Sequence, residues 1–95
     1  MLELRIYPDA VKFIASVGGK QAGKISIKIF ELLRDPNPHD SEQLKGTSGG
    51  FRRADLGEFR IVYLVVDNFL EVPLVGRRND DEVYKQMERK GLYPD

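Results

Sequence analysis

The sequence has no cysteine and only one histidine among its 95 residues. Without cysteine the chain forms no disulfide bond, no thiolate nucleophile and no cysteine-ligated zinc site. The single histidine, His39, cannot supply a two-histidine metal site or a pair of imidazoles for acid–base catalysis. A chain without cysteine fits a reducing compartment, and we expect the cytoplasm.

Long apolar runs are also missing. No segment approaches the roughly 20 apolar residues that cross a bilayer. The first residues, Met1–Arg5, alternate between apolar and charged side chains, which is typical of a strand and not of a secretory signal peptide. At this length we expect residues 1–95 to form a single small domain that has no contact with membranes.

An excess of charge of either sign is absent, because 15 basic residues balance 15 acidic ones. Nucleic-acid-binding proteins usually have a basic surplus, so the total charge argues mildly against such a role. The distribution favours it slightly, because basic residues concentrate in the segment 45–60 and in a second pair; they are Lys45, Arg52, Arg53, Arg60, Arg77 and Arg78.

The periodicity of apolar residues predicts an α+β domain. We expect a strand over 2–6, helices over 8–17 and 20–34, a loop up to about residue 43, three meandering strands over 51–55, 59–66 and 69–75, and a last helix. Asn79 and Glu82 resemble a capping box at the start of this last helix, and Gly91 is expected to end it.

The strand over 59–66 is apolar almost without interruption, which predicts a central position in the sheet. A two-residue turn at Asp67–Asn68 would place Arg60 opposite Val75, so that Arg77 shares the face of Arg60. Pro73, however, indicates an edge or a bulge in the returning strand, and a bulge would offset this register. Arg77 and Arg78 therefore remain alternatives.

The helix over 20–34 is apolar on two sides. One stripe predicts its core face and consists of Ala22, Ile25, Ile29, Leu32 and Leu33. Ile27 and Phe30 fall on the other side of the helix. They either lie beneath the following loop or form a docking strip for a partner.

Several familiar sites are excluded by spacing. Asp80, Asp81 and Glu82 are adjacent in the predicted helix, so their side chains diverge, and we interpret them as charges that suit a helix N-terminus. The glycines near residue 50 are not followed by the Gly-Lys-Ser/Thr pattern of a phosphate-binding loop. No spacing typical of a serine nucleophile and its triad is present.

The residues that remain for chemistry are arginine, lysine and tyrosine. RNA cleavage can proceed with this set, because RNA carries its own nucleophile in the 2′-hydroxyl group. Guanidinium groups bind phosphate oxygens in a fork and stabilise the charge of the pentavalent transition state. A tyrosine can stack on a base or take part in proton transfer. This route needs neither a metal ion nor a cofactor.

Two stretches resemble the RelE/ParE toxin superfamily. The first is Leu44-Lys45-Gly46 followed by FRRADLGEFRIVY over 51–63, and the second is VGRRNDDEVY over 75–84. The resemblance, to the RelE-like branch, implies an N-terminal strand, a two-helix hairpin, an antiparallel three-strand meander and a C-terminal helix. It further implies the toxin of a type II toxin–antitoxin system: a cytoplasmic, metal-independent endoribonuclease that cleaves mRNA in the ribosomal A site, arrests growth and is silenced by an antitoxin.

The resemblance also assigns roles to individual residues. Arg60 matches an arginine that binds the scissile phosphate and stabilises the transition state, and Arg78 one that stabilises the transition-state charge or protonates the leaving group. Tyr84 matches a tyrosine that stacks on the nucleobase and assists the proton transfer from the nucleophile. Lys45, Arg52, Arg53 and Arg77 are further candidates for RNA binding, and Ile27 and Phe30 for antitoxin binding.

Departures from the family pattern occur on the strand over 51–55. Arg52 matches one of two basic residues there, but the second position is Ala54; a shift by one residue would use Arg53 instead. Asp55 adds an acid where the family is usually basic. We expect it to pair with Arg53 or Arg60 and to weaken the grip on phosphate.

Two alternatives to the nuclease stay open. One is a ParE-like toxin, a non-enzymatic inhibitor of DNA gyrase, and the other is an inactive toxin that only binds its antitoxin. The set of Arg60, Arg78 and Tyr84 favours the nuclease, whereas Ala54 and Asp55 favour weak or absent activity.

Overall fold

The computed structural model describes residues 1–44, 50–78 and 82–89, with backbone alone at 82–84. Its elements, in chain order, are β1 (Glu3–Ile6), α1 (Pro8–Val17), α2 (Gly19–Arg34), β2 (Ser41–Gln43), β3 (Arg52–Leu56), β4 (Phe59–Val66), β5 (Phe69–Arg77) and α3 (Glu82–Arg89). The predicted α+β class and the order of the main elements are confirmed. None of the described helices is long and apolar enough to span a bilayer.

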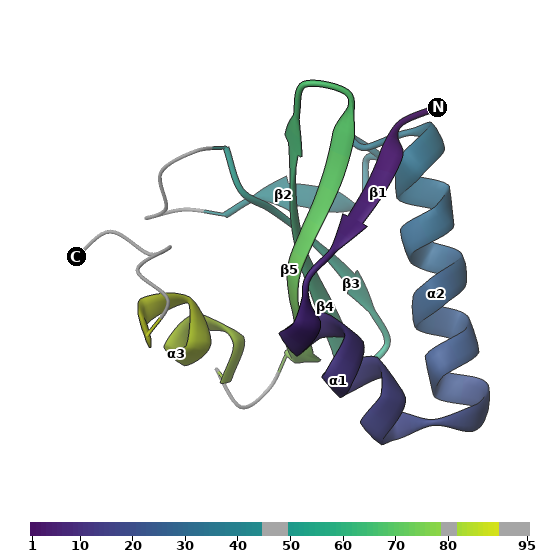
Figure 1. Cartoon of the computed structure of the whole chain (residues 1–95), viewed down its shortest axis with the longest axis vertical. Coiled ribbons are helices and arrows are strands. Elements are labelled where there is room, and N and C mark those ends of the chain that lie inside the picture. The colour runs from purple at the N-terminus through teal and green to yellow at the C-terminus, as the bar shows by residue number, and fades with distance from the viewer. Residues whose placement is uncertain (45–49, 79–81, 90–95) are drawn as a thin grey trace.

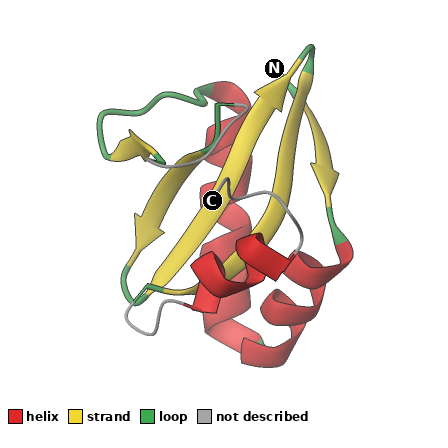
Figure 2. Ribbon diagram, turned by 90° about the vertical axis from the view of Figure 1, so that its left-hand side faces the viewer, coloured by secondary structure: helices red, strands yellow, loops and turns green. Residues whose placement is uncertain are grey.

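The five strands form one sheet in the order β1-β5-β4-β3-β2. β1 runs parallel to β5, and the other neighbours are antiparallel. Helices α1 and α2 lie on one side of the sheet and α3 on the other (Figures 1 and 2). β4 occupies the centre of the sheet, as its continuous apolar sequence predicted.

Both faces of the sheet are covered by apolar side chains at β4 and β5. The larger core lies between the sheet and α1 and α2, and the side chains buried in it include Ile25, Ile29, Ile61, Tyr63 and Val72. A smaller core lies under α3 and consists of Leu44, Phe51, Val62, Leu74 and Met87. Alternate residues of β4 therefore enter different cores, which explains why the strand is apolar on both sides.

The helix boundaries follow local rules. Pro8 begins α1, where its fixed φ angle and missing N–H cost nothing. Gly18 ends α1 with a φ angle of 58°, a left-handed conformation that glycine adopts without strain. The core stripe predicted for α2 is confirmed at four buried positions, Ile25, Ile29, Leu32 and Leu33.

The expectation of a loop up to residue 43 was wrong, because Ser41–Gln43 form the short edge strand β2. This segment pairs with Arg52–Ala54 of β3, and its sequence shows no strand pattern of its own. Ser41 is buried there, and its Oγ donates to the Pro38 carbonyl at 2.9 Å. The strand therefore depends on tertiary pairing, which a three-residue polar segment does not reveal.

β5 contains a bulge opposite Tyr63. The Asp67–Asn68 turn places Val66 opposite Phe69, as predicted, but between the pairs Leu64–Glu71 and Val62–Leu74 β4 advances two residues while β5 advances three. Pro73 lies in this bulge, beyond the last pair that β1 makes with β5. The predicted pair of Arg60 with Val75 was therefore wrong, and Arg60 pairs with Gly76.

Tyr63 also fixes the connection that follows α2. Its side chain is fully buried, and its hydroxyl donates a hydrogen bond to the Pro36 carbonyl at 2.7 Å. This bond connects the central strand β4 to the loop between α2 and β2.

We expect Tyr63→Phe to lower the free energy of unfolding by about 1–2 kcal/mol, because the Pro36 carbonyl loses its partner in a buried position. Urea denaturation followed by circular dichroism measures this change. The m-value should not change, since the fold is retained. A variant as stable as the unmodified protein would show that the bond contributes nothing.

Candidate functional site

The charged residues of the candidate site lie on the α3 side of the sheet. Arg53 pairs with Val62, and Asp55 pairs with Arg60. Val62 packs in the small core beneath α3 with Met87. Because side chains alternate along a strand, Arg53, Asp55 and Arg60 share the face of Val62.

Arg78 joins this face from the end of β5. After the bulge, Gly76 stands opposite Arg60, and the backbone N–H of Arg78 continues the ladder by donating to the Glu58 carbonyl at 2.9 Å. Residue 78 therefore points to the same side as residues 60 and 76. We call Arg53, Arg60 and Arg78 the arginine cluster.

Asp55 lies at the centre of the arginine cluster. Arg60 donates to it twice, from Nε to Oδ1 at 2.8 Å and from Nη2 to Oδ2 at 3.1 Å. Arg53 donates from Nη1 to Oδ2 at 3.0 Å. Arg78 is more distant, with its Nε 3.8 Å from Oδ2, and its Nη1 donates to the Gly57 carbonyl at 3.3 Å. Three guanidinium groups thus converge on one carboxylate.

The electrostatics of the cluster follow from this geometry. The hydrogen bonds from Arg60 hold the pKa of the Asp55 carboxyl below its usual value, and the charges of Arg60, Arg53 and Arg78 lower it further against the opposing effect of burial. The Arg60 side chain is only 11% exposed, compared with 44% for Arg78. Arg60 is therefore the interior cation of the cluster, and Arg78 lies at its rim.

Glu42 contributes a second acid that sequence reasoning missed. Its carboxylate binds Nη2 of Arg53 at 2.6 Å, because β2 places Glu42 opposite Arg53. This proximity was not predictable once β2 had been interpreted as a loop. These five described side chains, three arginines and the two acids Asp55 and Glu42, carry a net formal charge of 3 − 2 = +1.

Arg77 and Arg52 lie away from the cluster. Arg77 pairs with Phe59, stands over its ring at 5.3 Å and binds Glu58 at 2.9 Å. Arg52 pairs with Tyr63 on the face of the sheet that α1 and α2 cover, where its Nη2 donates to the Ser41 Oγ at 2.8 Å. The structure therefore places Arg78 rather than Arg77, and Arg53 rather than Arg52, beside Arg60.

The fold resembles that of solved RelE proteins. No protein-family model matches the sequence, and no curated protein does. A free-state mutant of Escherichia coli RelE superimposes with a TM-score of 0.77 at 24% identity, covering 96% of this chain and 98% of that one. RelE in an archaeal RelE–RelB complex from Pyrococcus horikoshii gives 0.72 at 24% identity, covering 83% and 97%. A chain of the RelBE toxin–antitoxin complex from Mycobacterium tuberculosis gives 0.70 at 19%, covering 81% and 98%.

The chain has the RelE fold. This confirms the fold expected from the two sequence stretches. The likeness covers 97% and 98% of the first two of these solved chains, so it extends over nearly their whole fold.

Two predicted site residues fall outside the described part of this RelE fold. Lys45 lies in the segment 45–49, which the structure does not describe. Tyr84 lies on α3, but its side chain is not among those described. The capping residue Asn79 and Gly91 are likewise outside the described residues.

The two candidate antitoxin contacts lie on the exposed side of α2. Ile27 is 59% exposed and Phe30 is 57% exposed, so neither lies beneath the following loop. Ser26, one turn before Phe30 on the same side of α2, lines an apolar groove between α1 and α2. This groove has a volume of about 320 Å³ and is also lined by Ile6, Val11, Ile14, Ala15, Gly18 and Ala22.

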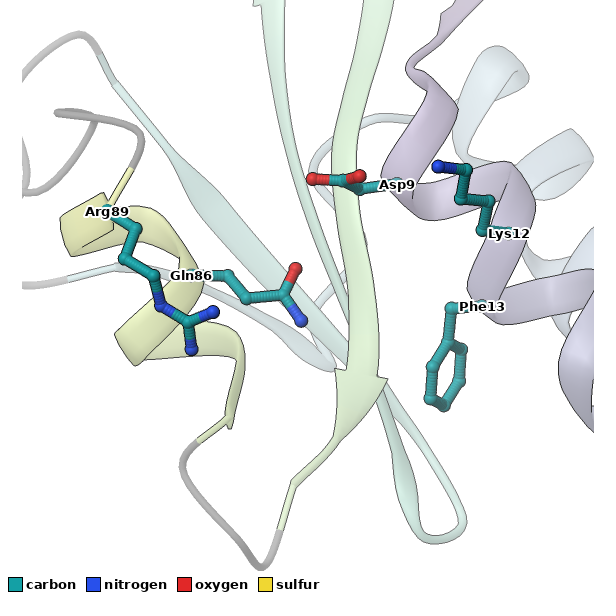
Figure 3. A pocket seen from close by; sticks show the side chains of 5 residues that line it. All are labelled: Asp9, Lys12, Phe13, Gln86 and Arg89. Atoms are coloured by element: carbon teal, nitrogen blue, oxygen red, sulfur yellow. The ribbon is translucent and has the colours of Figure 1, made fainter.

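A second, more polar cleft separates α1 from α3. It has a volume of about 530 Å³ and is lined by Asp9, Lys12, Phe13, Gln86 and Arg89 (Figure 3). In this view Asp9 and Gln86 point toward each other across the gap. None of the arginine cluster lines this cleft, so the two features are separate.

We expect Asp55→Asn to lower the free energy of unfolding at pH 7 by about 1–2 kcal/mol, because three arginines lose their shared counterion. The pKa of Asp55 is lowered in the folded protein, so its contribution is complete above the unfolded value near 4 and disappears as the pH falls through the folded value. Denaturation curves at pH 7 and pH 3 should therefore show a difference between the two proteins that shrinks at pH 3.

Glu42→Gln provides the control for this experiment. Its carboxylate is 68% exposed and binds only at the rim of the cluster, so its removal should cost less than that of Asp55. Equal stabilities of the Asp55→Asn variant and the unmodified protein at pH 7 would contradict the proposed role of the shared counterion.

Proposed function

We propose that this protein is the toxin of a type II toxin–antitoxin system and acts as a metal-independent endoribonuclease on mRNA in the ribosomal A site. The observation that carries this proposal is the convergence of Arg53, Arg60 and Arg78 on a single point of the sheet. Guanidinium groups that converge in this way suit a phosphate whose charge increases during reaction. The RelE fold supports the proposal, and the ribosomal substrate implies a cytoplasmic location.

The proposed reaction uses the RNA's own 2′-hydroxyl as the nucleophile. The hydroxyl gives up its proton to water, with Tyr84 taking part in the transfer, and its oxygen attacks the adjacent phosphorus. A pentavalent transition state forms, and the bond to the 5′-oxygen breaks to leave a 2′,3′-cyclic phosphate and a 5′-hydroxyl. Arg60 binds the non-bridging oxygens, and Arg78 stabilises the transition state or protonates the leaving oxygen. Tyr84 stacks on the base next to the cut, and Arg53 adds positive charge beside Arg60.

A second candidate function is favoured by the acids in the cluster. Asp55 and Glu42 together offset two of the three arginine charges. A protein neutralised in this way fits a toxin with weak activity, or one that only binds its antitoxin. The two functions differ in whether RNA is cut.

The partner we propose is a cognate antitoxin that covers the exposed apolar side of α1 and α2. Solved structures with the same fold include complexes of RelE with RelB. Ile27 and Phe30 expose apolar surface, and the neighbouring groove offers an apolar recess beside them. An amphipathic segment of the antitoxin that inserts apolar side chains here would bury this surface.

The first test is induced expression followed by primer extension on cellular mRNA. We expect growth arrest and discrete cuts within translated codons. Arg60→Ala and Arg78→Ala should each reduce cleavage by about 100-fold or more, because each removes a donor that stabilises the transition state. Tyr84→Phe keeps the ring and removes the hydroxyl, so it separates stacking from proton transfer.

Arg77→Ala is the matched control, because Arg77 has the same charge as its neighbour and lies on the opposite face of the sheet. It should retain most of the cleavage. If Arg77→Ala abolishes the cuts and Arg78→Ala does not, the proposed site is wrong. Arrest without cuts would indicate a gyrase-type toxin, and absence of arrest would indicate a protein that only binds its antitoxin.

The antitoxin surface has a test of its own. The double variant Ile27→Ser/Phe30→Ser should weaken antitoxin binding by about tenfold or more, because two apolar anchors are lost. Titration calorimetry measures the dissociation constant, and the midpoint of thermal unfolding should change little, since both side chains are exposed. Val65→Ser/Val66→Ser, which alters exposed apolar residues of β4, is the control. An unchanged dissociation constant in the α2 variant would place the antitoxin elsewhere.

A further inference from the structure

We propose that Asp55 competes with a phosphate of the RNA for the guanidinium edges of the arginine cluster, so that binding of RNA requires the arginines to exchange their bonds to the Asp55 carboxylate for bonds to phosphate. Asp55 is then an internal competitor that sets the affinity for RNA. That the competing anion is RNA rests on the proposed function. The competition itself concerns any phosphate.

The geometry of the contact between Arg60 and Asp55 carries the first step. Arg60 uses its Nε and Nη2 atoms together, one to each carboxylate oxygen, at 2.8 Å and 3.1 Å. This paired edge of a guanidinium group is the one that binds phosphate in a fork. A phosphodiester presents two non-bridging oxygens in a similar arrangement. The carboxylate and a phosphate therefore compete for the same edge of Arg60.

Arg53 and Arg78 also approach the Asp55 carboxylate, so a phosphate that binds the cluster competes with Asp55 for all three arginines. Arg53 donates to the same oxygen, Oδ2, that receives the second bond from Arg60. Arg78 approaches this oxygen to 3.8 Å and has a side chain that is 44% exposed. An incoming phosphate therefore meets Arg78 first, at the rim. It then gains the other two cations by replacing Asp55.

The backbone prevents Asp55 from moving away. β3 is paired with β4 over residues 52–56, so the backbone of residue 55 is held opposite Arg60, although the pairing with β2 ends at residue 54. Its side chain is short, and it can leave the cluster only by rotation about its own bonds. Arginine side chains are long, so exchange is expected to occur mainly by reorientation of the guanidinium groups toward RNA. The carboxylate then remains nearby and continues to oppose the bound phosphate.

Acidification does not relieve this competition near neutral pH. The pKa of Asp55 is lowered by the arginines, and among the described residues the charged groups that face it are Arg53, Arg60 and Arg78. The carboxylate is therefore ionised near neutral pH. The arginines exchange the carboxylate only for another anion. Asp55 therefore lowers the affinity for phosphate to the same extent throughout the neutral pH range and does not act as a pH switch.

The experiment measures binding of a single-stranded 2′-O-methyl RNA oligonucleotide, which cannot be cut because its nucleophile is blocked. Fluorescence anisotropy compares the unmodified protein with Asp55→Asn and Glu42→Gln. Both variants remove one negative charge from the same face of the sheet, but Glu42 contacts Arg53 at the rim and does not contact Arg60 in the described structure. Comparing the two variants therefore distinguishes the effect of removing the carboxylate that binds Arg60 from the effect of changing the total charge.

We expect Asp55→Asn to bind the oligonucleotide about three- to tenfold more tightly, as removal of one competing ion pair would give. The slope of log K against log salt concentration should become steeper by about 0.7, since one more phosphate is neutralised. Glu42→Gln should change both quantities less. A simple structural role for Asp55 would leave the salt dependence unchanged.

Weaker or unchanged binding by Asp55→Asn would overturn the proposal, because Asp55 would then position the arginines instead of competing with phosphate. Equal effects of the two substitutions would overturn it as well, because total charge alone would explain them. Both results would leave RNA cleavage by the unmodified protein intact, so they do not bear on the proposed function.

A measurement on the unmodified protein keeps the proposal testable if Asp55→Asn does not fold. Titration with inorganic phosphate should shift the Nε–H NMR signal of Arg60 in a saturable manner, as the bond to Asp55 is exchanged for one to phosphate. An Arg60 signal that does not respond would overturn the proposal. A saturable shift in a protein that proves unable to cut RNA would support the anion exchange while the proposed nuclease function fails.

Discussion

The single extra residue that β5 inserts opposite Tyr63 determines which side chains meet in the candidate site. Side chains alternate along a strand, so one residue more or less reverses the face of everything that follows. With the bulge, Arg60 stands opposite Gly76 and Arg78 reaches its face. Without it, Arg77 would stand beside Arg60, and Phe59 would lose the cation that now lies over its ring. The bulge therefore serves both the site and the packing on the opposite face.

A concentration of cations in a folded protein carries an electrostatic cost that nearby acids offset. In this chain Asp55 supplies a central counterion for Arg53, Arg60 and Arg78, and Glu42 supplies another at the rim. The same carboxylate that stabilises the cluster occupies the edge of Arg60 best suited to phosphate. Stability in the free state and affinity for phosphate are thus opposed at one residue. Such opposition is common where a site needs charges that the fold would otherwise exclude.

The two sides of the sheet present different surfaces. The side covered by α1 and α2 holds the larger core, and the outer surface of these helices exposes Ile27, Phe30 and an apolar groove. The side facing α3 holds the smaller core and, beside it, the arginine cluster. A partner that covers α2 and an RNA that binds the arginines would therefore use different surfaces. Any silencing of the site by such a partner would require more than simple occupation of α2.

Local patterns in the sequence determined the elements of this protein. Proline, glycine and the spacing of apolar residues predicted α1, α2 and the three long strands. The two apolar sides of α2 left open whether Ile27 and Phe30 are covered by the following loop, and the structure shows that both are exposed. The arginine and tyrosine content, with the absence of cysteine, pointed to chemistry on phosphate as one reaction that this set of residues can support. Tertiary structure alone decided the rest. β2 forms only because β3 pairs with it, which brings Glu42 to Arg53. The choice of Arg78 over Arg77, and of Arg53 over Arg52, depends on strand register, and register follows from pairing between distant segments that no local pattern records.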